Sequence, residues 1–156
     1  MNALPERLLT PSVMQGTLLA FDFGTVRIGV ASGNTVTCTA QALTTIQGEQ
    51  NELRFASLET LIGEWQPVAL VVGLPSYPDG APHEMTRLSQ RFARRLKGRF
   101  KLPVILIDER YTTTEASAHL TAMGIHGIRQ KPLLDQYAAQ QILQAYFNEP
   151  AMGILA

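Results

Sequence analysis

Carboxylate side chains stand at three places in this sequence where apolar residues surround them. Asp22 ends the apolar run TLLAFD, and Asp108 and Glu109 end the run VILIDE. Asp135 lies in LLDQYAAQQIL, where the residues three, four and seven positions later are Ala, Ala and Ile, so it shares the apolar face of an expected helix. Burying an unpaired charge is costly, so carboxylates in such positions indicate a chemical role.

Three converging carboxylates favour a hard metal ion. In an open α/β sheet, sites form beyond the carboxyl ends of the strands, and Asp22 and Glu109 stand at such ends. If their strands are neighbours and the last helix packs across them, Asp135 joins the pair. Such a cluster raises its own pKa values unless cations fill it, and oxygen ligands suit Mg²⁺ or Mn²⁺. Two such ions about 3.5–4 Å apart activate a water and stabilise the leaving oxygen of a phosphodiester.

Each carboxylate also has an ordinary structural interpretation. Asp22 could be a turn residue at a strand end, Asp108 or Glu109 a helix cap or ion-pair partner, and Asp135 a charge in the first helical turn. We expect Asp22, Glu109 and Asp135 to be catalytic and to hold the metal, since three structural explanations at once are less economical than one shared site.

The choice between Asp108 and Glu109 is open from alternation alone. Side chains alternate along a strand, but both faces of VILIDE are apolar. Reach favours Glu109, which lies one residue further past the strand end and has an extra methylene. We expect Asp108 to accept hydrogen bonds near the sheet.

The apolar patterns predict a β-β-β-α-β-α-β-α-α chain. Its order indicates an α/β fold with a mixed sheet and helices on both faces. The expected strands are 17–22 and 27–32, which form a hairpin, one within 36–46, and 68–72 and 104–107. The expected helices are 50–65, 83–97, 112–123 and one from 132 or 133 to about 147, with a loop at 73–82.

Charge is distributed unevenly along the chain. The net charge is zero, but residues 1–82 carry three basic and seven acidic groups, whereas residues 83–156 carry ten basic and six acidic groups. Arg87, Arg91 and Arg94 recur at helical spacing within this basic half. This face is either a track for nucleic-acid phosphates or a solvated helix surface, and both interpretations stay open.

Length and composition fit one globular domain. We expect it to span residues 16–149, with a flexible extension at 1–15 and a tail at 150–156. The single cysteine, Cys38, excludes an internal disulfide, and no Cys/His cluster indicates zinc. No apolar run approaches the roughly 20 residues of a membrane span, so a reducing cytoplasm is the expected location.

Four sequence blocks resemble the signature blocks of the YqgF/RuvX family. They are FDFGTVRIGVAS, VVGLPSYPDG, LIDERYTTTEA and LLDQYAAQQILQAYF, and together they cover nearly the whole chain. The family has a ribonuclease H-like fold, and its members are described as Holliday junction resolvases and as nucleases that process the 5′ end of precursor 16S ribosomal RNA. The resemblance implies a metal-dependent nuclease acting on precursor rRNA, with branched DNA as the alternative. Matched onto the pattern, its acids fall on Asp22, Glu109 and Asp135.

The sequence departs from the family pattern at three places. Gly33-Asn34 replaces a Ser-Asp, Ser76-Tyr77 replaces a Leu-Asn, and Lys131-Pro132 replaces a Lys-Gly. None of the three touches the acidic residues. The second and third lie in expected loops, so they bear on contacts with nucleic acid and hence on substrate preference.

Other residues are candidates for binding substrate. Arg27 and Arg110 flank the acids and could meet a phosphate or form an internal ion pair. Thr112 could touch phosphate or cap a helix, and Lys131 could clamp substrate or be solvated. Gly24 could allow close backbone approach or only a tight turn. The complete set is Gly24, Arg27, Arg91, Arg94, Arg110, Thr112, Arg129 and Lys131.

Two other function classes compete with a nuclease. The segment Asp22-Phe-Gly-Thr also resembles the opening of the nucleotide site in actin-like ATPases, which need two such domains. A non-catalytic nucleic-acid-binding module would gain nothing from buried, mutually repelling acids. RNA and DNA cannot be distinguished without contacts to the 2′-hydroxyl, and the chain could act as a monomer or a homodimer.

Overall fold

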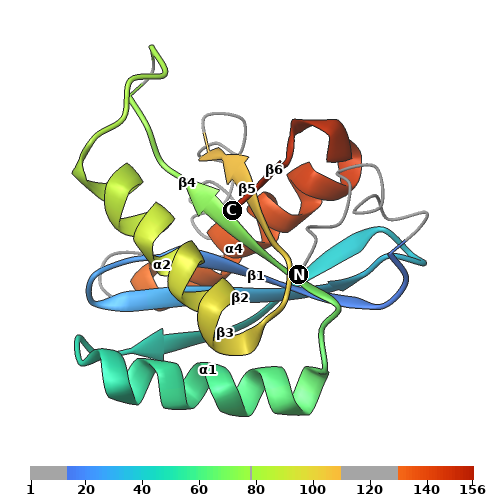
Figure 1. Ribbon diagram of the computed structural model, residues 1–156, viewed down its shortest axis with the longest axis horizontal. Coiled ribbons are helices and arrows are strands. Elements are labelled where there is room, and N and C mark those ends of the chain that lie inside the picture. Colours follow the sequence, from blue (N-terminus) through green and yellow to red (C-terminus); the bar gives the residue numbers. More distant parts are fainter. Residues whose placement is uncertain (1–13, 78, 110–129) are drawn as a thin grey trace.

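A six-stranded sheet forms the centre of the molecule in the computed structural model, which describes residues 14–77, 79–109 and 130–156 (Figure 1). Its strand order is β3-β2-β1-β4-β5-β6. The strands are β1 (Thr17–Phe23), β2 (Arg27–Asn34), β3 (Thr39–Gln47), β4 (Ala69–Leu74), β5 (Val104–Asp108) and β6 (Ile154–Leu155). The helices are α1 (Asn51–Trp65), α2 (Glu84–Phe100), α4 (Gln130–Asn148) and the 3₁₀ turn η4 (Pro150–Met152).

The sheet is mixed, as the sequence predicts. The first three strands form an antiparallel meander, because only short turns connect them. β4 and β5 run parallel to β1, since α1 and α2 each carry the chain back across the sheet before the next strand begins. β6 pairs antiparallel with β5. Therefore β1, β4 and β5 all end at the same edge, which we call the carboxyl edge.

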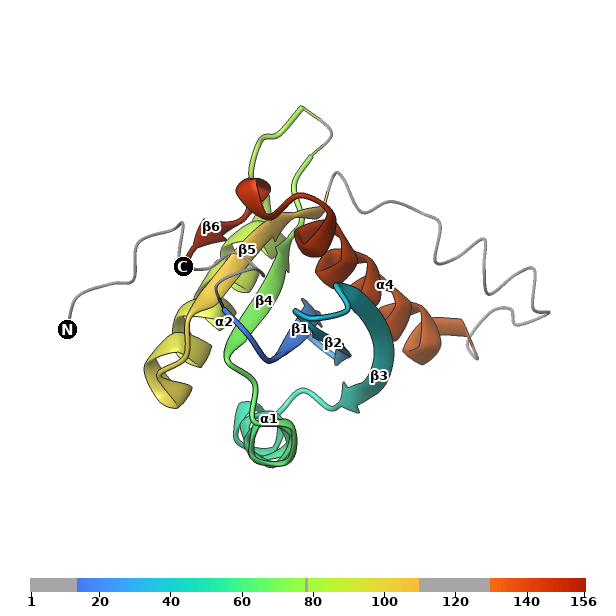
Figure 2. The ribbon, with the colours of Figure 1, turned by 90° about the vertical axis from the view of Figure 1, so that its right-hand side faces the viewer.

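Helices cover both faces of the sheet, with α4 on one side and α1 and α2 on the other (Figure 2). Two separate apolar cores result. Leu18 and Ala20 of β1 pack in the core with α4, whereas Leu19 and Phe21 pack in the core with α1 and α2. Central strands buried on both faces have no polar side, which explains their continuous apolar runs.

The element pattern agrees with the sequence prediction except at several ends. α2 continues to Phe100, three residues beyond the expected end, and β4 extends to Leu74, into the segment expected as a loop. Residues 150–156, expected as a tail, contain η4 and β6. The expected helix 112–123 lies outside the described residues. Within the described part of the chain, no helix is long and apolar enough to cross a membrane.

Candidate active site

The side-chain alternation of β1 and β5 directs Asp22 and Glu109 to the face that α4 covers. Asp22 follows Leu18 and Ala20, which pack in the α4 core. Glu109 follows Ile105 and Ile107 of the same core. The position of α4 therefore distinguishes Glu109 from Asp108, which the sequence pattern could not do. Asp108 has the opposite parity, and the Ser76 hydroxyl lies 3.5 Å from its Oδ1 atom.

A glycine in β4 lets Asp22 and Glu109 approach each other. β4 lies between β1 and β5, so these two strands are not direct neighbours, a point that the sequence left open. Gly73 of β4 removes the obstacle, because a Cβ atom built on it would lie 2.8 Å from Cγ of Glu109 and 2.4 Å from Cδ1 of Ile142. A larger residue at Gly73 would occupy the space through which the Glu109 side chain reaches Asp22.

The two carboxyl groups share a hydrogen bond, and both residues are partly buried. Burial raises the pKa of Asp22 well above its usual range, and the charges of Glu109 and then Asp135 add to this effect. Burial also raises the pKa of Glu109, helped by Asp108 and opposed by the hydrogen bond from Asp22 and by His83. A carboxyl pair of this kind holds a proton between its oxygens when no cation is there.

Asp135 lies opposite this pair on α4, pressed against β2. A Cβ atom built on Gly29 of β2 would lie 1.9 Å from the backbone oxygen of Asp135, so only glycine permits this packing. The Oδ2 atom of Asp135 accepts a hydrogen bond from Nε of Arg27 at 2.6 Å, and this ion pair is partly exposed. Of the two roles left open for Arg27, the structure shows the internal ion pair.

A cleft of about 300 Å³, which we call the acidic cleft, opens at this edge. Its walls are Asp22, the turn at 23–26, Arg27, Met85 and Asp135. In the parts of the chain that the structure describes, no three His, Cys, Asp or Glu side chains are already grouped to hold a metal ion, which agrees with Asp135 being paired to Arg27. The donor chemistry fits Mg²⁺ or Mn²⁺, because the hydrogen-bonded carboxyls of Asp22 and Glu109 offer hard oxygens and could exchange their shared proton for a cation.

Sequence comparison decides the family. The family model described as "RuvX: Holliday junction resolvase" matches residues 16–149. The chain belongs to the RuvX family.

Curated relatives of this RuvX chain share about half of its residues. A protein of Dechloromonas aromatica is 56% identical over 135 residues, covering 86% of this chain and 92% of its own, and one of Nitrosomonas europaea is 55% identical over 137 residues, covering 88% and 93%. Both carry the name "Putative pre-16S rRNA nuclease". The likeness therefore extends over most of the length of both relatives.

Among solved structures, RuvC of Thermus thermophilus shares the fold. Its TM-score is 0.56 at 12% identity, and the match covers 90% of this chain and 99% of RuvC. RuvC from T. thermophilus in complex with a Holliday junction substrate matches with the same TM-score at 13% identity. The expected ribonuclease H-like α/β fold is therefore confirmed.

The β1–β2 turn of the RuvX chain is held by an arginine that sequence analysis did not single out. Arg54 of α1 is only 3% exposed, and it donates from Nη2 to the carbonyl of Gly24 at 2.5 Å and from Nη1 to that of Thr25 at 2.8 Å. Its guanidinium also lies 5.0 Å from the ring centroid of Phe23. These contacts fix the three residues that follow Asp22.

The other residues predicted to bind substrate lie in different parts of the structure. Gly24 lines the acidic cleft, and a Cβ atom on it would lie 2.6 Å from the carbonyl oxygen of Arg27, as in a tight turn. Arg91 and Arg94 are exposed on α2, and Arg91 lines a cavity between α1 and α2 whose lining does not include Arg94. Lys131 is exposed in the first turn of α4. Arg110, Thr112 and Arg129 lie outside the described residues.

Several functional positions were missed at the sequence level. Gly29 and Gly73 stand inside strands, which is a known sign of close backbone approach. His83 caps α2, since its Nδ1 accepts from the backbone of Met85 at 3.1 Å while its own backbone N–H donates to Thr86 at 3.0 Å. The spacing of His83 and Thr86 was the available signal, because it matches a reciprocal cap.

Proposed function

We propose that this RuvX-family chain is a metal-dependent nuclease that hydrolyses phosphodiester bonds in precursor 16S rRNA. The observation that carries the proposal is the partly buried, hydrogen-bonded pair of Asp22 and Glu109 at the carboxyl edge, beside a cleft that Asp135 lines. Such a pair costs folding free energy, which a bound divalent cation would return as binding energy.

Each residue has a defined part in this mechanism. Asp22 and Glu109 would supply oxygens to hold Mg²⁺ or Mn²⁺, and Asp135 would complete the set if its carboxylate left Arg27. Bound cations, two in the mechanism we favour, would activate a water and stabilise the leaving oxygen of the phosphodiester. Arg27, once released, lies in the same cleft and can bind the substrate phosphate through its guanidinium.

The names of the relatives favour RNA over branched DNA. Both quoted relatives are named for precursor 16S rRNA, whereas the family model is described by Holliday junction resolution. A resolvase is the second candidate function, and it would require two sites and hence a homodimer, whereas a monomer suffices to trim one RNA strand. Processing of ribosomal RNA would place the protein in the cytoplasm.

A substrate comparison tests the proposal directly. Purified protein is given a labelled precursor 16S 5′-leader RNA and, separately, a four-way DNA junction, each with Mg²⁺, Mn²⁺ or EDTA. We expect metal-dependent cleavage of the RNA and none in EDTA, because the three proposed ligands, Asp22, Glu109 and Asp135, are all hard oxygen donors. Full cleavage in EDTA would contradict the metal mechanism, and cleavage of the junction alone, by a dimer in solution, would establish the resolvase.

A further inference from the structure

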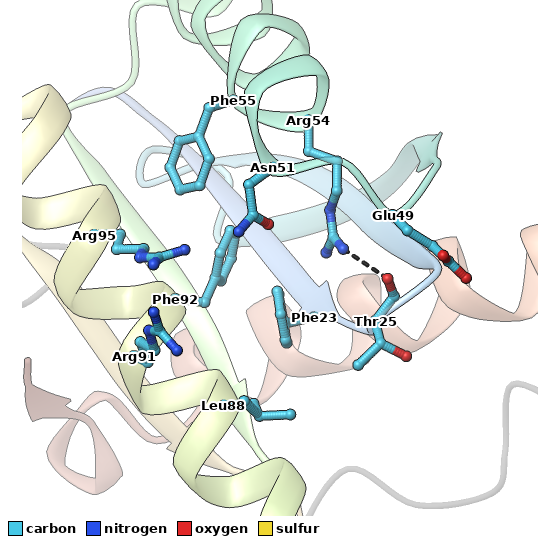
Figure 3. A pocket seen from close by; sticks show the side chains of 10 residues that line it. All are labelled: Phe23, Thr25, Glu49, Asn51, Arg54, Phe55, Leu88, Arg91, Phe92 and Arg95. Atoms are coloured by element: carbon cyan, nitrogen blue, oxygen red, sulfur yellow. Dashed lines mark hydrogen bonds between the residues drawn. The ribbon is translucent and has the colours of Figure 1, made fainter.

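A second cavity of about 210 Å³ lies behind the β1–β2 turn, between α1 and α2 (Figure 3). We call it the arginine pocket. Arginines and phenylalanines form most of its lining: Arg54, Arg91, Arg95, Phe23, Phe55 and Phe92. Figure 3 shows Arg91 and Arg95 extending from α2 toward the interior of the pocket, with Phe92 of the same helix beside them.

Among the described residues, no ion pair neutralises the two α2 arginines that line the pocket. On α2, Arg87 pairs with Glu84 and Arg99 with Glu59, but neither Arg91 nor Arg95 forms an ion pair with another described residue. Glu49 is the one acid in the lining, against three arginines. The buried Arg54 binds only backbone carbonyls and adds its charge to the wall. An anion would therefore meet a preformed cluster of guanidinium donors.

The pocket floor is aromatic. Phe23 and Phe92 stack with their ring centroids 4.7 Å apart, and Phe55 lies 6.1 Å from Phe92. Phe23 remains partly accessible, while Phe92 is buried. Guanidinium groups beside accessible ring surface provide partners for both parts of a nucleotide, the phosphate and the base or sugar.

The arginine pocket and the acidic cleft are neighbours that share a wall. Phe23 and Thr25 line both cavities, and they directly follow Asp22 in sequence. A nucleic-acid strand whose phosphate lies against Asp22 therefore needs to cross only this turn to enter the pocket. Arg54 keeps the shared wall in place through its bonds to Gly24 and Thr25.

We propose that the arginine pocket is a second substrate subsite, in which Arg91 and Arg95 bind a phosphate of the single strand that flanks the scissile bond. This inference rests on the proposed nuclease function and extends it. It assigns the basic face of α2 a definite part: Arg91 and Arg95 contact the strand, and Arg94, which is outside the lining, does not share this role.

Binding without cleavage separates this inference from the proposed function. The affinity of the full chain for a labelled single-stranded RNA is measured in EDTA at several salt concentrations. The variant Arg91→Gln/Arg95→Gln should bind at least about tenfold more weakly, because charge-assisted hydrogen bonds are lost. Its slope of log affinity against log salt should fall by about 0.7 to 1.4, for one or two phosphate contacts on a single strand.

A charge-matched control comes from the far end of the same helix. Lys97→Gln/Lys101→Gln removes two positive charges at the C-terminal end of α2 that do not line the pocket. It should leave the affinity within about twofold, since exposed charges that do not contact the strand are screened by salt. Arg94→Gln should have a smaller effect than Arg91→Gln alone. If the control pair or Arg94→Gln weakens binding as much as the pocket variants do, a diffuse basic surface explains binding and the proposal is wrong.

A free nucleotide offers the same chemistry as a strand, so uridine 5′-monophosphate is the competing ligand. If it raises the melting temperature of the wild-type protein but not of Arg91→Gln/Arg95→Gln, while that variant binds the RNA normally, the pocket takes a free nucleotide and the strand subsite is wrong. If the binding results hold but no RNA is ever cleaved, the subsite stands and the nuclease proposal fails.

Discussion

The two cavities on either side of the β1–β2 turn carry opposite charge. On the α4 face, the acidic cleft gathers Asp22 and Asp135 beside the Asp22–Glu109 pair. On the α2 face, the arginine pocket gathers guanidinium groups with no acidic partner bound to Arg91 or Arg95. The contrast illustrates how a chain of zero net charge can place the proposed metal site and the proposed phosphate-binding surface side by side. The sheet and the β1–β2 turn lie between the acidic cleft and the arginine pocket.

The largest effect on cleavage should come from Glu109, the acid that strand alternation directs to the α4 face. Glu109→Gln should reduce cleavage by orders of magnitude with little change in RNA affinity, because it removes a proposed metal ligand and leaves the arginine pocket intact. Asp108→Asn, one residue earlier on the opposite face, should retain appreciable turnover and mainly lower the melting temperature. Single-turnover rates and RNA affinities of both variants measure this, and an inactive, well-folded Asp108→Asn beside an active Glu109→Gln would reverse the assignment.

Gly29→Ala should disturb the acidic cleft by a steric clash that does not involve the arginine pocket. The new methyl group would collide with the backbone of Asp135, so α4 must shift, at a cost of about 1–3 kcal/mol or more. We expect a lower melting temperature and a large loss of cleavage.

A glycine in open space provides the control for Gly29→Ala. Gly63 of α1 has no atom within 4 Å of a built Cβ, and alanine there should stabilise the helix by about 0.5–1 kcal/mol. Thermal unfolding and cleavage assays on both variants test the contrast. Equal behaviour of the two would mean that α4 does not need its close contact with β2.

Without metal, Asp22→Asn should raise the melting temperature near neutral pH. Burial and the neighbouring acids raise the pKa of Asp22 in the folded protein, so folding favours the protonated form. At pH values below the ordinary aspartate pKa both states are protonated and the penalty is absent. As pH rises from there toward the raised folded pKa, the unfolded chain ionises first and the folded state loses stability.

The test is a series of melting curves against pH in EDTA. The wild-type protein should lose stability from acidic to neutral pH more steeply than Asp22→Asn. Added Mg²⁺ should stabilise the wild type and not the variant, because ligand binding favours only the folded state. Parallel curves for the two proteins would show that the carboxyl pair is not under strain. Asp135→Asn would remove part of the negative charge that acts on Asp22, but it would also remove the ion pair with Arg27.

The smallest effect should come from Arg54→Lys, which weakens the wall between the cavities. Lysine keeps the charge but cannot reach both carbonyls in the planar geometry of a guanidinium, so one hydrogen bond is lost, worth about 0.5–1.5 kcal/mol. We expect a modest decrease in melting temperature and in both cleavage and RNA affinity. Arg99→Lys, on the exposed side of α2, should change none of these measurably.

Much of this architecture could be read from the sequence because strong periodic signals define it. The hairpin, the apolar strands β4 and β5 and the amphipathic helices have patterns set by burial, and the buried acids contradict those patterns visibly. Strand order is not a local property. Hence the sequence left open that β4 separates Asp22 from Glu109 and that Gly73 allows them to meet.

Ion pairs and hydrogen bonds between residues far apart in the sequence could not be predicted either. Arg27 and Asp135 are 108 positions apart, and only the packing of α4 on β2 brings them to 2.6 Å. The same holds for Arg54 and the turn it fixes. Sequence spacing identified the charged residues but could not say which of them neutralise one another.

The two-residue strand β6 has a consequence for solubility. It pairs with Ile105 and Leu106 of β5, and the backbone N–H of Ala156 donates to the carbonyl of Val104 at 2.9 Å. Without it, the run VILI would be the outer strand of the sheet, with unpaired backbone groups and high β-propensity, a template on which a second molecule could add a strand. β6 itself is too short to serve as such a template. By covering the edge of β5, these few residues should therefore reduce aggregation.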